Sequence, residues 1–182
     1  MTRATQFAFA LFVAVAMGLA ARSARAEPPN AKATPVYVLS IWTDDADDQA
    51  DALTQALRSR VRQGQGWSLL ETPQSFETLA IALKCPARPD AACLQRIADQ
   101  LHADHYIWGM MGKKKTPGEV TADMHLWSRG KPEGDASESY SENLKDASDE
   151  SLRQIATRLF GKVTGGVAGG TLVVHAGSGG GY

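Results

Sequence analysis

Residues 105–111 are the stretch that most constrains the fold of this chain, because the run His-Tyr-Ile-Trp-Gly-Met-Met is apolar at nearly every position. A strand that is buried on one face alternates apolar and polar residues, whereas this one offers apolar side chains to both faces. It therefore needs cover on both sides, which predicts a central place in a sheet with helices above and below. Gly109 and Gly112 indicate a close backbone approach and a turn.

Further strand and helix patterns surround this central strand. Strands are expected at residues 36–42, 67–71, 119–127 and 136–143, and helices from the acidic turn at 44–48 to residue 63, then at 73–83, 91–101 and 149–163. Helical crossovers join the first three strands, which should run parallel, and hairpins join the last three, so that the fourth is antiparallel to its neighbours. The expected fold is α/β, with one three-layer α/β/α arrangement around a five-stranded mixed sheet of order 2-1-3-4-5.

The first residues predict export. Arg3 precedes an apolar run at 7–21, and Ala24-Arg25-Ala26 then offers the small-x-small site at which a secretory signal peptide is cut, between Ala26 and Glu27. The run is shorter than the about 20 residues of a membrane span, although an uncleaved anchor is the alternative. Residues 27–34 are expected to be a disordered leader. A periplasmic or secreted protein without stable membrane insertion is therefore expected.

Charge gives no reason to expect a polyanionic partner. The formal net charge is −1, and removal of residues 1–26, which hold three arginines and no acid, changes it to −4. A weakly acidic chain offers no electrostatic attraction to nucleic acid or to an anionic membrane.

The chain has two cysteines, Cys85 and Cys93. In an oxidising compartment an isolated pair eight positions apart is most simply a disulfide. The alternatives are a cysteine nucleophile served by His102 or His105, or metal ligation, although a zinc site usually has four closely spaced ligands.

The acidic turn at 44–48 has a spacing that resembles a calcium loop but lacks its glycine and closing glutamate. Thr43 or Asp44 is instead expected to cap the following helix, whose positive N-terminus the acids favour. Because the turn follows a parallel strand, where α/β proteins bind ligands, it is also the one small-molecule candidate.

Two surfaces are candidates for a protein partner. Lys113, Lys114 and Lys115 stand at a hairpin tip, where a solvated turn is the simpler interpretation. The polar strand at 136–143 suits a sheet edge, and its backbone, around Ser137, Ser139 and Ser141, could accept a partner's strand.

Two stretches resemble the amino-terminal domain of TolB proteins. Residues 98–110 are similar to that family's signature of a helix, Gly-Ala-Asp-Tyr, an apolar strand and Gly, with His102 where the family usually has Gly. Residues 149–165 are similar to its closing helix. The resemblance covers residues 35–165, and it implies a periplasmic, non-enzymatic α/β domain that pairs with other envelope proteins. The glycine-rich tail at 166–182, with one strand at 171–176, resembles the start of a PEGA-type domain that is truncated.

The leading functional hypothesis is an exported adaptor or scaffold of the cell envelope, with no catalytic residue, cofactor or metal. None of the four histidines has a Glu-x-x-His companion that would indicate a metalloenzyme. The alternatives are a periplasmic thiol- or metal-dependent enzyme and a cell-wall glycan binder. For the last of these, Trp67 and Trp127 are the candidates for exposure, since Trp42 and Trp108 lie on strands expected to be buried.

Overall fold

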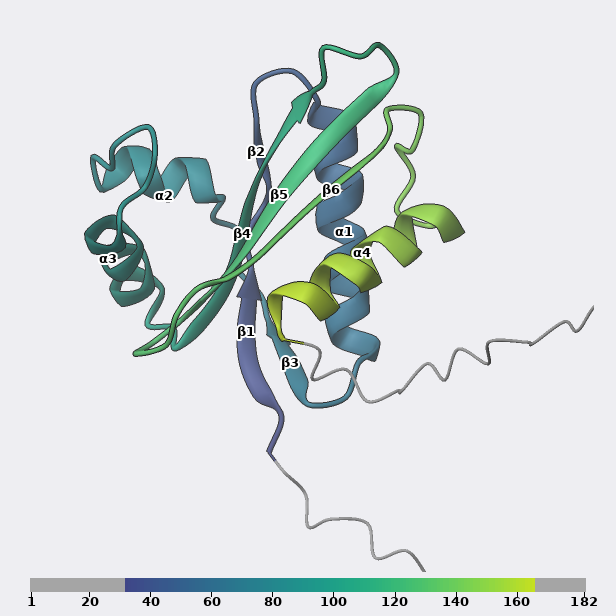
Figure 1. The fold of residues 1–182 in the computed structure, drawn as a ribbon. Coiled ribbons are helices and arrows are strands. Elements are labelled where there is room, and N and C mark those ends of the chain that lie inside the picture. The colour runs from purple at the N-terminus through teal and green to yellow at the C-terminus, as the bar shows by residue number, and fades with distance from the viewer. Residues whose placement is uncertain (1–31, 166–182) are drawn as a thin grey trace, which may run out of the picture. The chain divides into compact units, whose positions relative to one another are not determined.

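A computed structural model describes residues 32–165, all of which belong to one compact unit. Strands and helices alternate over the first two thirds of this segment, and a three-stranded meander and a final helix follow (Figure 1). The elements are β1 (Thr34–Val38), β2 (Trp42–Thr43), α1 (Asp47–Gln63), β3 (Trp67–Leu70), α2 (Phe76–Ala82), α3 (Ala91–Leu101), β4 (His105–Lys113), β5 (Glu119–Ser128), β6 (Gly134–Ser141) and α4 (Glu150–Val163). The expected signal peptide with its cleavage site, most of the expected leader and the expected tail strand lie outside the described residues.

The strands form one mixed sheet of order β3-β1-β4-β5-β6, and the two-residue β2 also pairs with β4. β3, β1 and β4 are parallel, whereas β5 is antiparallel to both β4 and β6. The α/β class is therefore confirmed. The sheet differs in detail, because it has six strands in place of the expected five.

The extra strand arises because the expected strand at 36–42 is interrupted between β1 and β2. The Arg58 side chain donates to the Val38 carbonyl through Nε and Nη2, at 3.1 and 3.0 Å. The Ile41 N–H donates to Thr54 Oγ1 at 3.2 Å. Both partners come from α1, which therefore satisfies backbone groups at the interruption.

The central place of β4 is confirmed. It lies between β1 and β5, and Tyr106, Ile107 and Trp108 are all buried. Gly109 makes the expected close approach, because a Cβ there would lie 2.5 Å from Met124 Sδ. The turn expected at Gly112 is wrong, since β4 continues through this residue to Lys113.

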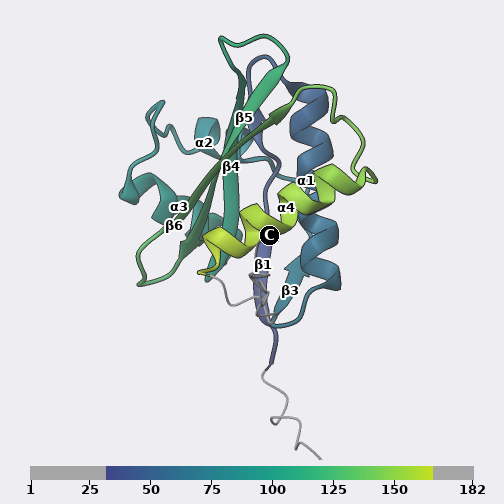
Figure 2. The same ribbon diagram turned by 45° about the vertical axis from the view of Figure 1, so that its right-hand side comes forward.

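Helices cover the two faces of the sheet unequally (Figures 1 and 2). α1 and α4 lie on one side and build a large apolar cluster with Ile107, Met111 and the apolar residues of β5. α2 and α3 lie on the other side and form a smaller cluster with Tyr106, Trp108 and Trp127. We call the second side the α2/α3 face and the first the α1/α4 face.

Three helices begin as local rules require. Ser75, Asp90 and Asp149 are the N-caps of α2, α3 and α4, and each side chain accepts a hydrogen bond from the first turn. The first helix corrects an expectation, because its N-cap is Ala46, which makes no side-chain bond. The Thr43 hydroxyl accepts instead from the N–H groups of Asp45 and Ala46, at 3.3 and 3.0 Å, and so orders the turn before the helix.

Within residues 32–165, no helix is long and apolar enough to cross a membrane.

Candidate functional site: the open end of the sheet

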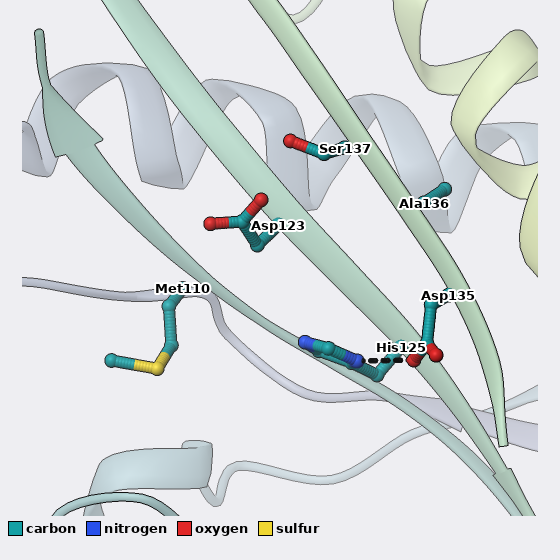
Figure 3. A pocket seen from close by; sticks show the side chains of 6 residues that line it. All are labelled: Met110, Asp123, His125, Asp135, Ala136 and Ser137. Carbon is teal, nitrogen blue, oxygen red and sulfur yellow. Dashed lines mark hydrogen bonds and ion pairs between the residues drawn. The ribbon is translucent and has the colours of Figure 1, made fainter.

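A surface on the α2/α3 face is left uncovered where β4, β5 and β6 extend beyond the two helices. A cavity of about 470 Å³ lies on it. Figure 3 shows the lining side chains, which come from all three strands: Met110, Asp123, His125, Asp135, Ala136 and Ser137. We call this surface the open face.

The open face follows from strand geometry. Successive side chains of a strand point to opposite sides, so Thr121, Asp123 and His125 of β5 share one side. The register of β5 and β6 then places His125 opposite Asp135 and Asp123 opposite Ser137. Directly opposed residues are close enough to interact. His125 Nδ1 accordingly lies 2.6 Å from Asp135 Oδ1.

His125 packs on a stack of aromatic rings. Phe76 of α2 stacks on Trp108 with ring centroids 4.4 Å apart, and Trp108 stacks on His125 at 4.1 Å. Trp108 Nε1 also donates to Glu133 Oε1 at 2.8 Å. One buried tryptophan therefore positions both His125 and Glu133.

His125, Glu133 and Asp135 form a cluster, which we call the His–Glu–Asp cluster. One potential ligand atom from each lies within 4.8 Å of the others. Among the described residues, the ion-pair partner of Asp135 is His125, and Glu133 has none. The other face of β6 differs, since Glu138 there pairs with Arg158 and Lys162 of α4. The negative charge of the cluster is thus left for solvent or a ligand.

The sequence did not lead us to this cluster. The alternation of β5 did place His125 on the polar side, but its partners come from beyond the turn at 129–133. Only the strand register, which that turn sets, shows that His125 faces Asp135. An alignment of the two strands of this hairpin in the sequence could have predicted the cluster.

β6 is an exposed edge of the sheet (Figure 2). Bonds between antiparallel strands fall on every second residue pair. The Glu142 N–H donates to the Gly118 carbonyl at 2.9 Å, and steps of two along the register make the even-numbered residues of β6 the ones bonded to β5. The N–H and C=O groups of the odd-numbered residues therefore point away from the sheet: Asp135, Ser137, Ser139 and Ser141.

The expected disulfide is present. Cys85 and Cys93 are bonded, with Cα atoms 5.5 Å apart, and the bond ties the end of α2 to the first turn of α3. Both cysteines of the chain are thus bonded, which leaves no free thiol for His102 or His105 to activate.

The two histidines proposed for that role have other places. His102 is the exposed C-cap of α3 and has left-handed backbone angles, with φ of 51°. His105 begins β4, packs edge-on against Trp67 and has a buried Nδ1. Burial first, and the positive charge of Lys131 second, lower the pKa of His105.

The acidic turn is held by partners within the protein. Asp45 Oδ1 accepts from the Lys113 N–H at 3.0 Å, and Asp48 pairs with Lys145 at 3.1 Å. The lysine hairpin is exposed as expected, and Lys114 pairs with Glu119 at its base, at 3.1 Å.

The exposure expected for Trp127 is wrong. Its side chain is 9 % exposed, because it stacks on Tyr106 at 5.4 Å and the Arg129 guanidinium lies over its ring. Trp127 falls where α2 and α3 cover the sheet, which the strand pattern alone does not reveal. Trp67 is half-buried between His105 and Phe160.

No protein-family model matches the chain, and no curated protein matches its sequence. Solved structures to which the chain is similar include the hypothetical protein CT253 from Chlamydia trachomatis, with 10% identity over 73% of this chain and 99% of that chain and a TM-score of 0.47. Lipoprotein GNA1162 from Neisseria meningitidis has 12% identity over 74% of this chain and 99% of that chain, with a TM-score of 0.39. TolB from Acinetobacter baumannii has 9% identity over 74% of this chain and 29% of that chain, with a TM-score of 0.45. These neighbours include TolB and a lipoprotein, and at such identities and TM-scores function must be argued from the residues themselves.

Proposed function

We propose that the protein is an exported, non-enzymatic protein of the cell envelope that works as an interaction module, and that a partner's extended segment adds to the sheet at β6. The observation that carries this proposal is the row of outward backbone groups at the odd-numbered residues of β6. Addition of a strand to an exposed edge supplies a partner with main-chain hydrogen bonds.

β6 suits this role better than the opposite edge. It has eight residues, whereas β3 at the other edge has four. Its outward residues carry short side chains, three of them serines, which leave the backbone accessible. Glu138, the longest acidic side chain of the strand, is turned towards α4 and paired there. A neighbouring strand would therefore meet few obstacles along β6.

A thiol-dependent enzyme and a glycan binder have less support. The thiol-dependent enzyme lacks a thiol, since both cysteines are in the disulfide. For a glycan binder, the two tryptophans that were candidates for exposure offer little surface within residues 32–165, because Trp127 is buried and Trp67 is half-buried. Export rests on the amino-terminal pattern, which ends in the Ala24-Arg25-Ala26 site.

Replacement of Ser139 by proline tests the edge. Proline removes one outward N–H while the inward ladder stays intact, and edge strands tolerate it. Loss of one intermolecular bond, together with the obstruction by the ring, should reduce partner capture from the cell's own envelope extract by about tenfold or more. Ser139→Ala is the matched control, because it removes the hydroxyl that bonds Thr121 but keeps the N–H.

The bound partner should also protect the amide protons of Ser137, Ser139 and Ser141 from hydrogen exchange. If Ser139→Pro folds with an unchanged melting temperature and still captures the same partner, β6 is excluded as the docking edge. Charge reversal at Lys113, Lys114 and Lys115 then tests the lysine hairpin in the same assay.

A further inference from the structure

We propose that the His–Glu–Asp cluster on the open face binds a divalent transition-metal ion, for which zinc is the best chemical match. The three ligands are an imidazole nitrogen of His125 and one carboxylate oxygen each from Glu133 and Asp135. The proposal does not depend on strand addition at β6, because it concerns side chains on the face and not backbone groups at the edge.

The distances are close to those that an ion requires. Ligand atoms that share one tetrahedral zinc at about 2.1 Å lie about 3.4 Å from one another. The three potential ligand atoms of the cluster already lie within 4.8 Å of one another, and His125 Nδ1 and Asp135 Oδ1 are 2.6 Å apart. Since the Asp135 side chain is 66% exposed, it is free to move. Small rotations of the two carboxylates around a fixed imidazole therefore complete the site.

The imidazole is fixed by the aromatic rings beneath it. The ring of His125 lies on Trp108, and Trp108 lies on Phe76, which is fully buried. Trp108 Nε1 also holds one oxygen of Glu133, which leaves the second oxygen of that carboxylate for a ligand. Metal sites commonly have such outer groups that orient the ligands, and their loss weakens binding.

Charge and ligand type select the kind of ion. Two carboxylates that no lysine or arginine neutralises, within the part of the chain that the structure describes, favour a cation. A mixed nitrogen and oxygen set suits zinc and its neighbours in the transition series, whereas calcium and magnesium prefer oxygen alone. The cavity beside the cluster leaves the remaining coordination positions open to water or to a donor group of another molecule.

Calorimetric titration of the untagged, full-length mature chain with zinc chloride tests the proposal. Cobalt chloride is the second probe, because a nitrogen and oxygen site gives visible absorption bands with this ion. We expect saturable binding of one ion per chain. His125→Phe keeps a ring on Trp108 but removes the nitrogen, and Glu133→Gln keeps the acceptor for Trp108 but removes the charge. Each should weaken zinc binding by about tenfold or more.

Asp123→Asn is the matched control. It removes a negative charge from the same cavity but leaves the His–Glu–Asp cluster intact, so zinc affinity should change less than about twofold. If His125→Phe does not fold, Glu133→Gln and Asp135→Asn decide the question. The proposal is overturned if no saturable binding is seen, if these variants bind zinc as the unmodified chain does, or if Asp123→Asn weakens binding as much as Glu133→Gln.

Discussion

The two faces of the sheet are built by the same strands, but they differ in how completely they are covered. On the α1/α4 face, Val120, Ala122, Met124 and Leu126 of β5 are all buried in one continuous cluster. On the α2/α3 face the same strand carries exposed Asp123, partly buried His125 and buried Trp127. The first face is uniform along the strand, whereas the second changes from open to covered.

The difference follows from the lengths of the covering helices. α1 and α4 have 17 and 14 residues, while α2 and α3 have 7 and 11. A helix advances about 1.5 Å per residue, so the short pair reaches only part of the sheet. One face can therefore supply stability while the open end of the other is free for polar groups and binding.

Removal of a large side chain should show the largest difference between the two faces in the free energy of unfolding. Leu159→Ala in α4 creates a cavity at a fully buried position and should lower the free energy of unfolding by about 2–5 kcal/mol. Met110→Ala on the open face, where the side chain is 36% exposed, should lower it by at most about 1 kcal/mol. Urea unfolding followed by circular dichroism measures both, and equal losses would contradict the comparison.

The disulfide should stabilise α2 and α3, the two short helices, in particular. Loss of the bond in the double variant Cys85→Ala and Cys93→Ala should lower the free energy of unfolding by about 2.5 kcal/mol in the chain-entropy model. Hydrogen exchange should increase first in α2 and α3, which the bond joins. An increase that is equal in α1 and α4 would mean that the two sides unfold as one unit.

Gly134 tests how closely α4 packs on the end of β6. A Cβ at this position would lie 2.0 Å from the Val163 carbonyl oxygen, so Gly134→Ala should displace the last turn of α4 and destabilise the protein by about 1–3 kcal/mol. A Cβ at Gly161, in the same helix, would have no atom within 4 Å. Gly161→Ala should therefore stabilise the protein by about 0.5–1 kcal/mol. Melting temperatures that shift in the same direction would refute this account.

The smallest expected effect is at the end of α3. His102 has a φ of 51°, which a residue with a Cβ adopts at a cost and glycine adopts freely. His102→Gly should raise the free energy of unfolding by about 0.5–1 kcal/mol, since relief of the strain exceeds the added freedom of the unfolded chain. His102→Ala, which keeps the Cβ, is the control and should bring no gain in thermal unfolding.

The sequence by itself determined the features that depend on local rules or on short periodic patterns. The apolar run at 105–111 predicted the central β4, and the kind of connection, helical crossover or hairpin, predicted which strands are parallel. Ser75 and Asp149 cap their helices by a local rule, because a side chain at the N-cap reaches only the adjacent turn. The disulfide could likewise be predicted, because its two cysteines are close in the chain.

Only the tertiary structure decided the features that depend on which remote groups meet. Arg58 lies 20 positions from Val38, whose carbonyl it binds where β1 ends. Trp127 is buried because α2 and α3 happen to reach it, while His125, two residues earlier on the same side of β5, lies at their margin. The His–Glu–Asp cluster requires a strand register and a ring stack from α2 at once. Residue type and periodicity describe which side of a strand a group is on, whereas burial and partners depend on how far each neighbouring element extends.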